Sequence, residues 1–336
     1  MRPFKYTRAS TIPAAIKLAG ANSNAKFLAG GTNIVDLMKE DVEQPDELVD
    51  ITRLKLTQIK EIPEGIHKGG VSIGGLGKNT ETANHELIRM QYPLLTQAIL
   101  AGASAQIRNM ATNGGNLLQR TRCPYFYDVA MPCNKRKPGS GCGAMAGINR
   151  MHAIFGWSEK CIAVFPSDMS VALAALEAVV KVQDHKGQER SIAFADFHRL
   201  PGDIPEKDNN LAHAELITAI ELPKNNFANN SYYLKVRDRA SYAFALVSVA
   251  AGLELDGNKI TKARIAMGGV AHKPWRALKA EQMLVGKEAS EANFKAAAET
   301  EMDTAKPLEY NKFKIELGSR AIARALYMAA NQNGNK

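Results

Sequence analysis

Four cysteines lie close together in one part of the sequence. They are Cys123, Cys133, Cys142 and Cys161, spaced C-x9-C-x8-C-x18-C, and the rest of the 336-residue chain has none. Glycines and prolines between them are typical of loops whose backbone is free in some places and stiff in others. Four thiols in one such segment fit a single site with four ligands.

Three kinds of site are compatible with this spacing. A structural zinc site usually contains close pairs such as C-x2-C, which are absent here. Two disulfide bonds are allowed by the count, but the N-terminal residues show no apolar segment of a signal peptide, which weakens that alternative. An iron–sulfur cluster tolerates wider spacings when loops deliver its ligands. The spacing alone leaves metal and disulfide open.

Two glycine pairs form the second group of candidate residues. They lie in residues 28–33 (LAGGTN) and 111–117 (ATNGGNL). Glycines let a backbone lie close to a ligand, and successive N–H groups can then point at a pyrophosphate. Neither segment reads GxGxxG or ends in GK[ST], which argues against a Rossmann dehydrogenase and a P-loop enzyme.

The pattern of apolar residues predicts the elements that position these segments. A capped helix at 11–18 and strands at 26–29 and 47–51 form a small unit with parallel pairing. Further on we expect a loop-rich stretch at 122–157, a helix at 168–176, and strands near 178–182 and 216–222. A boundary follows at 223–226. Beyond it we expect extended segments at 231–236, 244–255 (with a helical start as an alternative) and 260–267, then two helices and an amphipathic helix at 315–330. Separate helices and strands indicate the α+β class.

Composition excludes several classes of protein. Hydrophobic residues make up 45% and charged residues 23% of the chain, which is ordinary for a folded protein. No apolar run is long enough for a transmembrane helix. The net charge is +9, but the bases are scattered except at residues 135–137 (KRK), so nucleic-acid binding is disfavoured. His152, His198 and His213 are isolated and suggest no metal site, and no GxSxG sequence suggests a hydrolase.

Five segments, in order, resemble the FAD-binding medium subunit of molybdenum hydroxylases, the superfamily of xanthine dehydrogenase, carbon monoxide dehydrogenase and aldehyde oxidoreductase. They are residues 26–33 (KFLAGGTN), 106–118 (QIRNMATNGGNLL), 165–168 (FPSD), 235–250 (KVRDRASYAFALVSVA) and 263–277 (ARIAMGGVAHKPWRA). The resemblance covers nearly the whole chain. The cysteine segment makes it closest to the flavin subunits of periplasmic aldehyde oxidoreductases.

The resemblance implies which residues bind FAD. The first loop would hold the pyrophosphate, the second loop would contact the same cofactor with Leu118 beside its rings, and Asp168 would bond to a ribityl or ribose hydroxyl. The full set is Lys26, Phe27, Leu28, Ala29, Gly30, Gly31, Thr32, Asn33, Ile34, Thr112, Gly115, Asn116, Leu118, Asp168, Leu216 and Lys235. Asp168 could equally be a helix N-cap and Lys235 an ordinary strand lysine, and Tyr242 could line the ring or belong to the core.

The resemblance also favours one reading of the cysteines. A minority of these flavin subunits carry, after the second glycine loop, an insert that holds a [4Fe-4S] cluster. Here the insert would span about 120–161, with Cys123, Cys133, Cys142 and Cys161 as ligands. The bases at 135–137 would offset the charge of the cluster, or form a solvated loop tip.

The implied architecture and function follow from the family. We expect an α+β protein: an FAD-binding domain at 1–223, built from a small parallel unit and a mixed sheet, and a C-terminal α+β domain at 227–332. The implied function is electron transfer to FAD and an external acceptor, in complex with a [2Fe-2S] subunit and a molybdopterin-binding catalytic subunit that oxidises an aldehyde.

The alternatives are a stand-alone flavin oxidoreductase, a xanthine or hydroxybenzoyl-CoA hydroxylase subunit, and a scaffold protein with structural zinc. The sequence by itself suggests the cytoplasm, whereas export with a partner subunit would place the protein in the periplasm.

Overall fold

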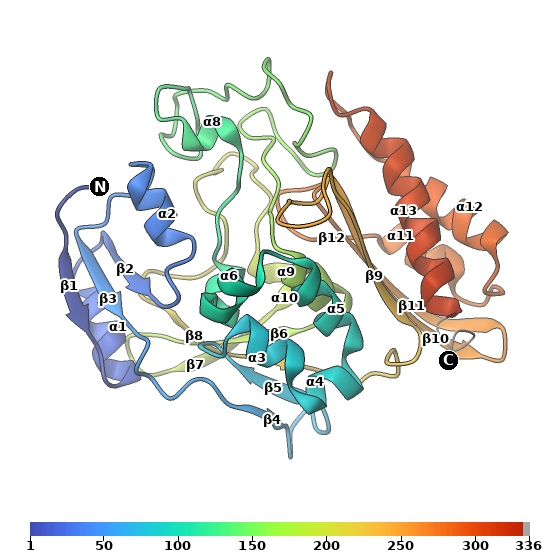
Figure 1. Cartoon of the computed structure of the whole chain (residues 1–336), viewed down its shortest axis with the longest axis horizontal. Helices are drawn as coiled ribbons and strands as arrows, with labels where there is room; N and C mark the ends of the chain where they lie inside the picture. Colours follow the sequence, from blue (N-terminus) through green and yellow to red (C-terminus); the bar gives the residue numbers. More distant parts are fainter. Residues whose placement is uncertain (332–336) are drawn as a thin grey trace.

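The N-terminal unit of the fold is a small parallel sheet. The computed structural model describes residues 1–331. Strands β1 (Lys5–Arg8), β3 (Glu47–Asp50) and β2 (Ala25–Leu28) lie in the order β1-β3-β2, with α1 (Ile12–Gly20) and α2 (Ile34–Lys39) beside them (Figure 1). The predicted parallel unit is confirmed. Strand β1 escaped prediction because its residues are mostly exposed and show no apolar alternation.

A five-stranded sheet forms the centre of the first half of the chain. Its order is β4-β5-β8-β6-β7, with strands β4 (Ile59–Glu61), β5 (Val71–Gly74), β6 (Val179–Gln183), β7 (Glu189–Ala193) and β8 (Leu216–Leu222). Every pairing is antiparallel, so the expected mixed sheet is wrong in this detail. A short turn joins β6 to β7, and a tight connection of this kind permits only antiparallel pairing.

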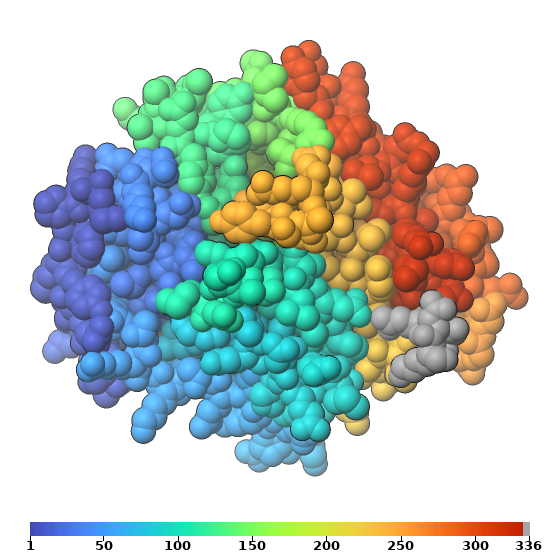
Figure 2. Space-filling model, viewed as in Figure 1, coloured from blue at the N-terminus to red at the C-terminus, as the bar shows by residue number. Residues whose placement is uncertain are grey.

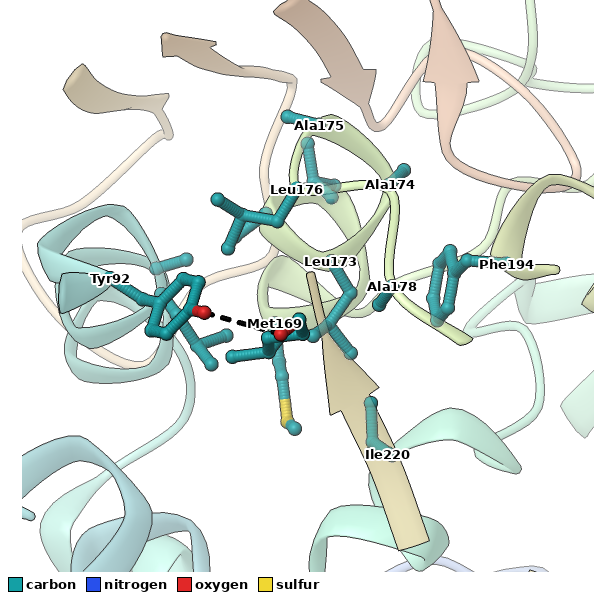
Figure 3. Packing of buried hydrophobic residues seen from close by; sticks show 14 of the residues in the cluster. Tyr92, Met169, Leu173, Ala174, Ala175, Leu176, Ala178, Phe194 and Ile220 are labelled. Atoms are coloured by element: carbon teal, nitrogen blue, oxygen red, sulfur yellow. Dashed lines mark hydrogen bonds between the residues drawn. The ribbon is translucent and has the colours of Figure 1, made fainter. Parts of the chain in front are cut away.

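Short helices cover this sheet and carry the second glycine loop. They are α3 (Asn79–Asn84), α4 (Glu86–Gln91), α5 (Pro93–Ala101), α6 (Ala105–Met110), α7 (Asn113–Leu117) and α10 (Phe194–Phe197). Helix α9 (Asp168–Ala175) differs from them because all eight of its residues are buried. Figure 3 shows α9 residues such as Met169 and Leu173 packed among Tyr92, Phe194 and Ile220. The core therefore holds α9 firmly, with Asp168 as its first residue.

The C-terminal part is an antiparallel sheet covered by helices. Strands β9 (Ser231–Val236), β10 (Val247–Asp256), β11 (Lys259–Gly268) and β12 (Trp275–Arg276) lie in the order β12-β11-β10-β9. Helices α11 (Leu278–Leu284), α12 (Glu291–Met302) and α13 (Phe313–Ala330) pack on it (Figure 1). The helical start considered for 244–255 is wrong. Residues 244–246 are not helical, and the apolar run that follows is a strand buried between its neighbours β9 and β11.

The α+β class is confirmed. The expected domain boundary at 223–226 falls between β8 and β9, and the expected end at 332 lies outside the described residues. No helix within residues 1–331 is long and apolar enough to cross a membrane.

The cysteine segment is almost without regular structure. Its one helix is α8 (Pro124–Tyr127), and isolated bridges pair Cys133 with Cys142 and Ser158 with Cys161. It lies near the N-terminal end of α13 in Figure 1, and the Tyr310 N–H donates to Asn149 Oδ1 at 3.0 Å. The insert is thus attached to the C-terminal part as well as to the glycine loops.

Candidate cofactor-binding sites

A cleft of about 740 Å³ lies between the N-terminal half and the segment that follows β9. Most of its lining comes from four parts of the chain: residues 31–39, helices α5 to α7, the start of α9, and residues 235–244. Asn79, Gln119, Arg122 and Met151 complete it. Figure 2 shows the segment after β9, in orange, lying against the glycine-loop half of the molecule. Such a volume lies within the range of small-molecule and cofactor sites.

Seven of the residues predicted to bind FAD line this cleft. They are Gly31, Thr32, Asn33, Gly115, Asn116, Asp168 and Lys235. The fold therefore brings together the two glycine loops, the FPSD segment and β9, whose members Gly31 and Lys235 are 204 positions apart in sequence.

The first glycine loop presses directly against the second. A Cβ atom on Gly30 would lie 2.1 Å from the carbonyl oxygen of Met110. Gly31 has a φ of +72°, a conformation that other residues rarely adopt. Both glycines are thus required by the backbone, one by space and the other by dihedral angle.

A hydrogen bond between a side chain and the backbone anchors the end of the first loop. Asn33 Oδ1 accepts from the Arg120 N–H at 2.8 Å. Arg120 in turn forms ion pairs with Glu43 and with Asp208 (Nε to Oδ2, 2.9 Å). The guanidinium is largely buried, and these two carboxylates raise its pKa although burial opposes them. The first loop is therefore fixed to the start of the cysteine insert.

The second glycine loop becomes the N-terminus of α7. Thr112 is its N-cap, with Oγ1 accepting from the Gly115 N–H at 3.2 Å. The side chain of Asn116 is occupied by protein partners, because it donates to Asn79 at 2.9 Å and accepts from Ser167 at 2.5 Å. Asn116 therefore braces the cleft wall, joining the second loop to the FPSD segment.

The remaining predicted residues support the cleft without lining it. Thr112 and Leu216 are buried, Phe27 and Ala29 pack on the N-terminal core, and Lys26 and Leu118 are exposed. Leu28, Gly30 and Ile34 are half-buried. Their contact with a cofactor stays a prediction.

Asp168 and Lys235 form a buried ion pair at the cleft. Lys235 Nζ lies 2.8 Å from Asp168 Oδ2, and Tyr233 donates its hydroxyl to Oδ1 at 2.7 Å. Asp168 is the first residue of α9 rather than its N-cap. Ser167 caps the helix, because its Oγ accepts from the Ser170 N–H at 3.0 Å. Burial and the neighbouring carboxylate raise the pKa of Tyr233, so its hydroxyl stays a donor.

Several residues of the cleft were not predicted from the sequence. Arg122 forms an ion pair with Asp36 of α2 at 2.7 Å, and Arg108, Arg239 and Phe244 line the same space. Tyr242, expected either beside the ring or in the core, lines this space and is more than half exposed, so it does not belong to the core; its φ is +49°. Arg108 and Arg239 lie inside the family-like segments, so that resemblance was the one available signal for them.

All four cysteines line one small pocket. Cys123, Cys133, Cys142 and Cys161 face the same space, and none of them forms a disulfide. Burial raises the pKa of Cys123 to about 12 and that of Cys161 to about 11. Within residues 1–331, no three His, Cys, Asp or Glu side chains form a group close enough for a single metal ion.

A buried cation stands behind this pocket. Lys135 is 2% exposed; its Nζ lies 2.6 Å from Asp208 and donates to the Pro205 carbonyl at 2.5 Å. Lys135 and Arg120 hold the pKa of Asp208 well below its usual range, against the effect of burial. Arg136 binds the carbonyls of Tyr125 and Phe126. The basic trio is therefore largely built into the insert, with Lys137 as its exposed member.

One histidine that the sequence gave no reason to select touches a cysteine. His152 Nε2 lies 3.1 Å from Cys123 Sγ. Burial, with a smaller effect of Lys314, lowers the pKa of His152 to about 4, so its ring is neutral. His198 and His213 instead contact backbone carbonyls.

Comparison with known proteins identifies the class. Residues 2–225 match the family model for the FAD binding domain in molybdopterin dehydrogenase, and residues 232–328 match that for the CO dehydrogenase flavoprotein C-terminal domain. The chain therefore belongs to the FAD-binding subunits of the molybdenum hydroxylase family.

Individual relatives extend this assignment. The chain is 48% identical, over 99% of its length and 100% of the relative's, to the aldehyde oxidoreductase FAD-binding subunit PaoB of Escherichia coli K12. It is 29% identical, over 84% of its length and 82% of the relative's, to the glyceraldehyde dehydrogenase medium chain of Sulfolobus acidocaldarius. CO dehydrogenase from Oligotropha carboxidovorans shares the fold, with a TM-score of 0.77, 23% identity, and coverage of 98% of this chain and 99% of the other.

Proposed function

We propose that this chain is the FAD-binding electron-transfer subunit of a molybdenum-dependent aldehyde oxidoreductase complex, and that its four cysteines hold a [4Fe-4S] cluster. The observation that carries the proposal is the meeting of four thiols in one pocket, which a smaller cavity lined by Cys123 and Arg122 connects to the cleft. When bound, the two cofactors supply one- and two-electron redox chemistry that side chains lack. The residues of this chain bind, orient and separate them.

The cleft suits a dinucleotide. Gly31 and Gly115 of the two glycine loops and the cations of Arg108, Arg239 and Lys235 border its space. Lys235 is already balanced by Asp168, whereas among the described residues Arg108 and Arg239 have no carboxylate partner. These two cations suit the negative phosphates of FAD.

The cysteine pocket suits a thiolate-bound cluster. Burial raises the pKa of the Cys123 and Cys161 thiols, so these two are protonated when unligated and would release protons when a cluster binds. Lys135 lies close enough to Cys161 to favour its thiolate form. The cation therefore offsets part of the negative charge that four thiolates bring into a buried place.

The partners and compartment belong to the same proposal. Electrons would come from a molybdopterin-binding catalytic subunit by way of a [2Fe-2S] subunit and leave to an external acceptor. The aldehyde substrate class is taken from the relative of 48% identity, whereas an E. coli xanthine dehydrogenase subunit is 25% identical. The cytoplasm, or the periplasm after export with a partner, is tested by fractionating cells that express the complex.

The absorbance spectrum and composition of the complex test the proposal. We expect one FAD and four irons with sulfide bound to this chain, in addition to the partners' cofactors. Cys133→Ser should lose this iron and keep FAD, whereas Lys137→Ala, on the exposed part of the same loop, should keep both.

Three results would contradict the proposal. A Cys133→Ser chain with its full iron content would exclude the ligand assignment, and zinc in place of iron would favour a structural site. If the purified chain oxidised an aldehyde by itself, the stand-alone flavin enzyme would be the better reading.

A further inference from the structure

One cysteine faces both sites. A second cavity, of about 200 Å³, adjoins the proposed FAD cleft and shares with it Arg122, Met151, Pro166, Ser167, Asp168 and Phe244. Of the four cysteines only Cys123 lines this cavity. Cys123 is thus the ligand on the flavin-facing side of the cysteine pocket, and His152 lines the same cavity.

Hydrogen bonds on both sides hold the backbone of His152 beside that sulfur. Its backbone N–H donates to the Asn149 carbonyl at 3.0 Å, and its own carbonyl accepts from Lys314 Nζ at 2.9 Å and from Asn311. The side chain is buried, and Nδ1 has no hydrogen-bond partner among the described residues. The contact between Nε2 and Cys123 Sγ is therefore the polar contact that the ring makes.

The chemistry of a thiolate decides the direction of this contact. A thiolate ligand has no proton to donate, so the 3.1 Å contact is a hydrogen bond when the imidazole proton sits on Nε2. A hydrogen bond to a cluster sulfur favours the reduced, more negative state and raises the reduction potential.

We propose that His152 donates an Nε2–H hydrogen bond to the thiolate of Cys123, the ligand that faces the flavin, and thereby raises the reduction potential of the cluster. This inference rests on the proposed cluster. His152 is a positioning residue: it acts through Cys123 and is not itself a ligand.

The reduction potential of the cluster in the purified complex tests this role, followed by EPR during a redox titration. His152→Phe should keep four irons and FAD. It should lower the equilibrium constant for cluster reduction by roughly tenfold, which is about 59 mV for one electron. His152→Gln, whose amide N–H can replace the donor, should restore most of the potential. His198→Phe is the matched control, because His198 is equally buried but bonds to the Leu117 carbonyl at 2.9 Å, and it should leave the potential unchanged.

A measurement on the unaltered protein removes dependence on variant folding. Pulsed EPR of the reduced cluster should detect an exchangeable proton and the nitrogen of ¹⁵N-labelled histidine, and D₂O should remove the proton signal. Absence of this coupling, an unchanged potential in His152→Phe, or loss of iron in both His152 variants would overturn the inference. An unaltered protein without iron would refute the proposed cluster instead.

Discussion

The proposed FAD cleft and the cysteine pocket are built from different parts of the chain: one mainly from backbone, the other from side chains. The cleft is assembled from backbone at two glycine loops that come together only in the fold, with residues from β9 closing it. The pocket is assembled from side chains within 39 residues, on loops with one short helix. Both designs agree with the cofactors that we propose for them, because a large anionic cofactor needs close approach of the backbone, whereas a small cluster needs four thiolates.

The two regions are nevertheless joined by buried charge. Asp208 pairs with Lys135 of the insert and with Arg120, whose N–H holds Asn33 of the first glycine loop. Each region can therefore be perturbed alone or through this shared link, and the expected effects fall in the order given below.

The largest effect is expected at the link. Asp208→Ala leaves two buried cations with fewer counter-charges and should lower the free energy of unfolding by about 3–5 kcal/mol. Urea denaturation measures the loss of stability, and analysis of flavin and iron should show a lower content of both cofactors. Glu316→Gln, which breaks an exposed pair with Arg320, is the control and should change little. If FAD stayed bound at full affinity in Asp208→Ala, the two regions would be independent.

A change at the first glycine loop should weaken FAD binding without changing the iron content. In Gly30→Ala the new Cβ would overlap the Met110 carbonyl and push the loops apart, at a cost of about 1–3 kcal/mol. We expect the FAD dissociation constant to rise about tenfold to a hundredfold, with iron content unchanged. Flavin fluorescence measures the affinity. Gly20→Ala, where the nearest atom is 3.8 Å away, should behave as the unaltered chain. Unchanged FAD affinity in Gly30→Ala would show that the loops yield easily.

Lys314, which binds the His152 carbonyl of the insert, should make the free energy of unfolding depend on pH. Burial lowers the pKa of Lys314 to about 7, from 10.5 in the unfolded chain. Between these values the unfolded state binds more protons, so the free energy of unfolding should rise with pH, by up to about 1.4 kcal/mol per unit. Below pH 7 both states are protonated and the slope disappears. Denaturation at several pH values should show this slope in the difference between the unaltered protein and Lys314→Met. Lys312→Met, at an exposed neighbour, should leave it intact, and parallel curves for Lys314→Met would refute the assignment.

The smallest effect is expected at a helix cap. Thr112→Ala removes the acceptor for the Gly115 N–H and should cost about 1 kcal/mol of stability. Thr11→Ala removes the equivalent cap of α1, far from the cleft in sequence, at a similar cost. Thermal unfolding compares the two, and flavin titration should show weaker FAD binding in Thr112→Ala alone. Equal FAD affinity in both variants would mean that the cap is merely structural.

The sequence alone determined the class, the parallel unit, and most of the later elements, because local capping, apolar periodicity and turns are written in neighbouring residues. It also selected the two glycine loops and four cysteines, since these residue types are rare in such groups. It did not identify strand β1, whose pairing depends on a distant partner, or the antiparallel order of the second sheet.

Only the tertiary structure decided which groups meet. Asp168 and Lys235 are 67 positions apart in sequence, Arg120 and Asp208 are 88 apart, and His152 and Cys123 are 29 apart. None of these residues is unusual by itself. Their roles arise because burial removes water and leaves each charged or polar atom with the partner that the fold provides.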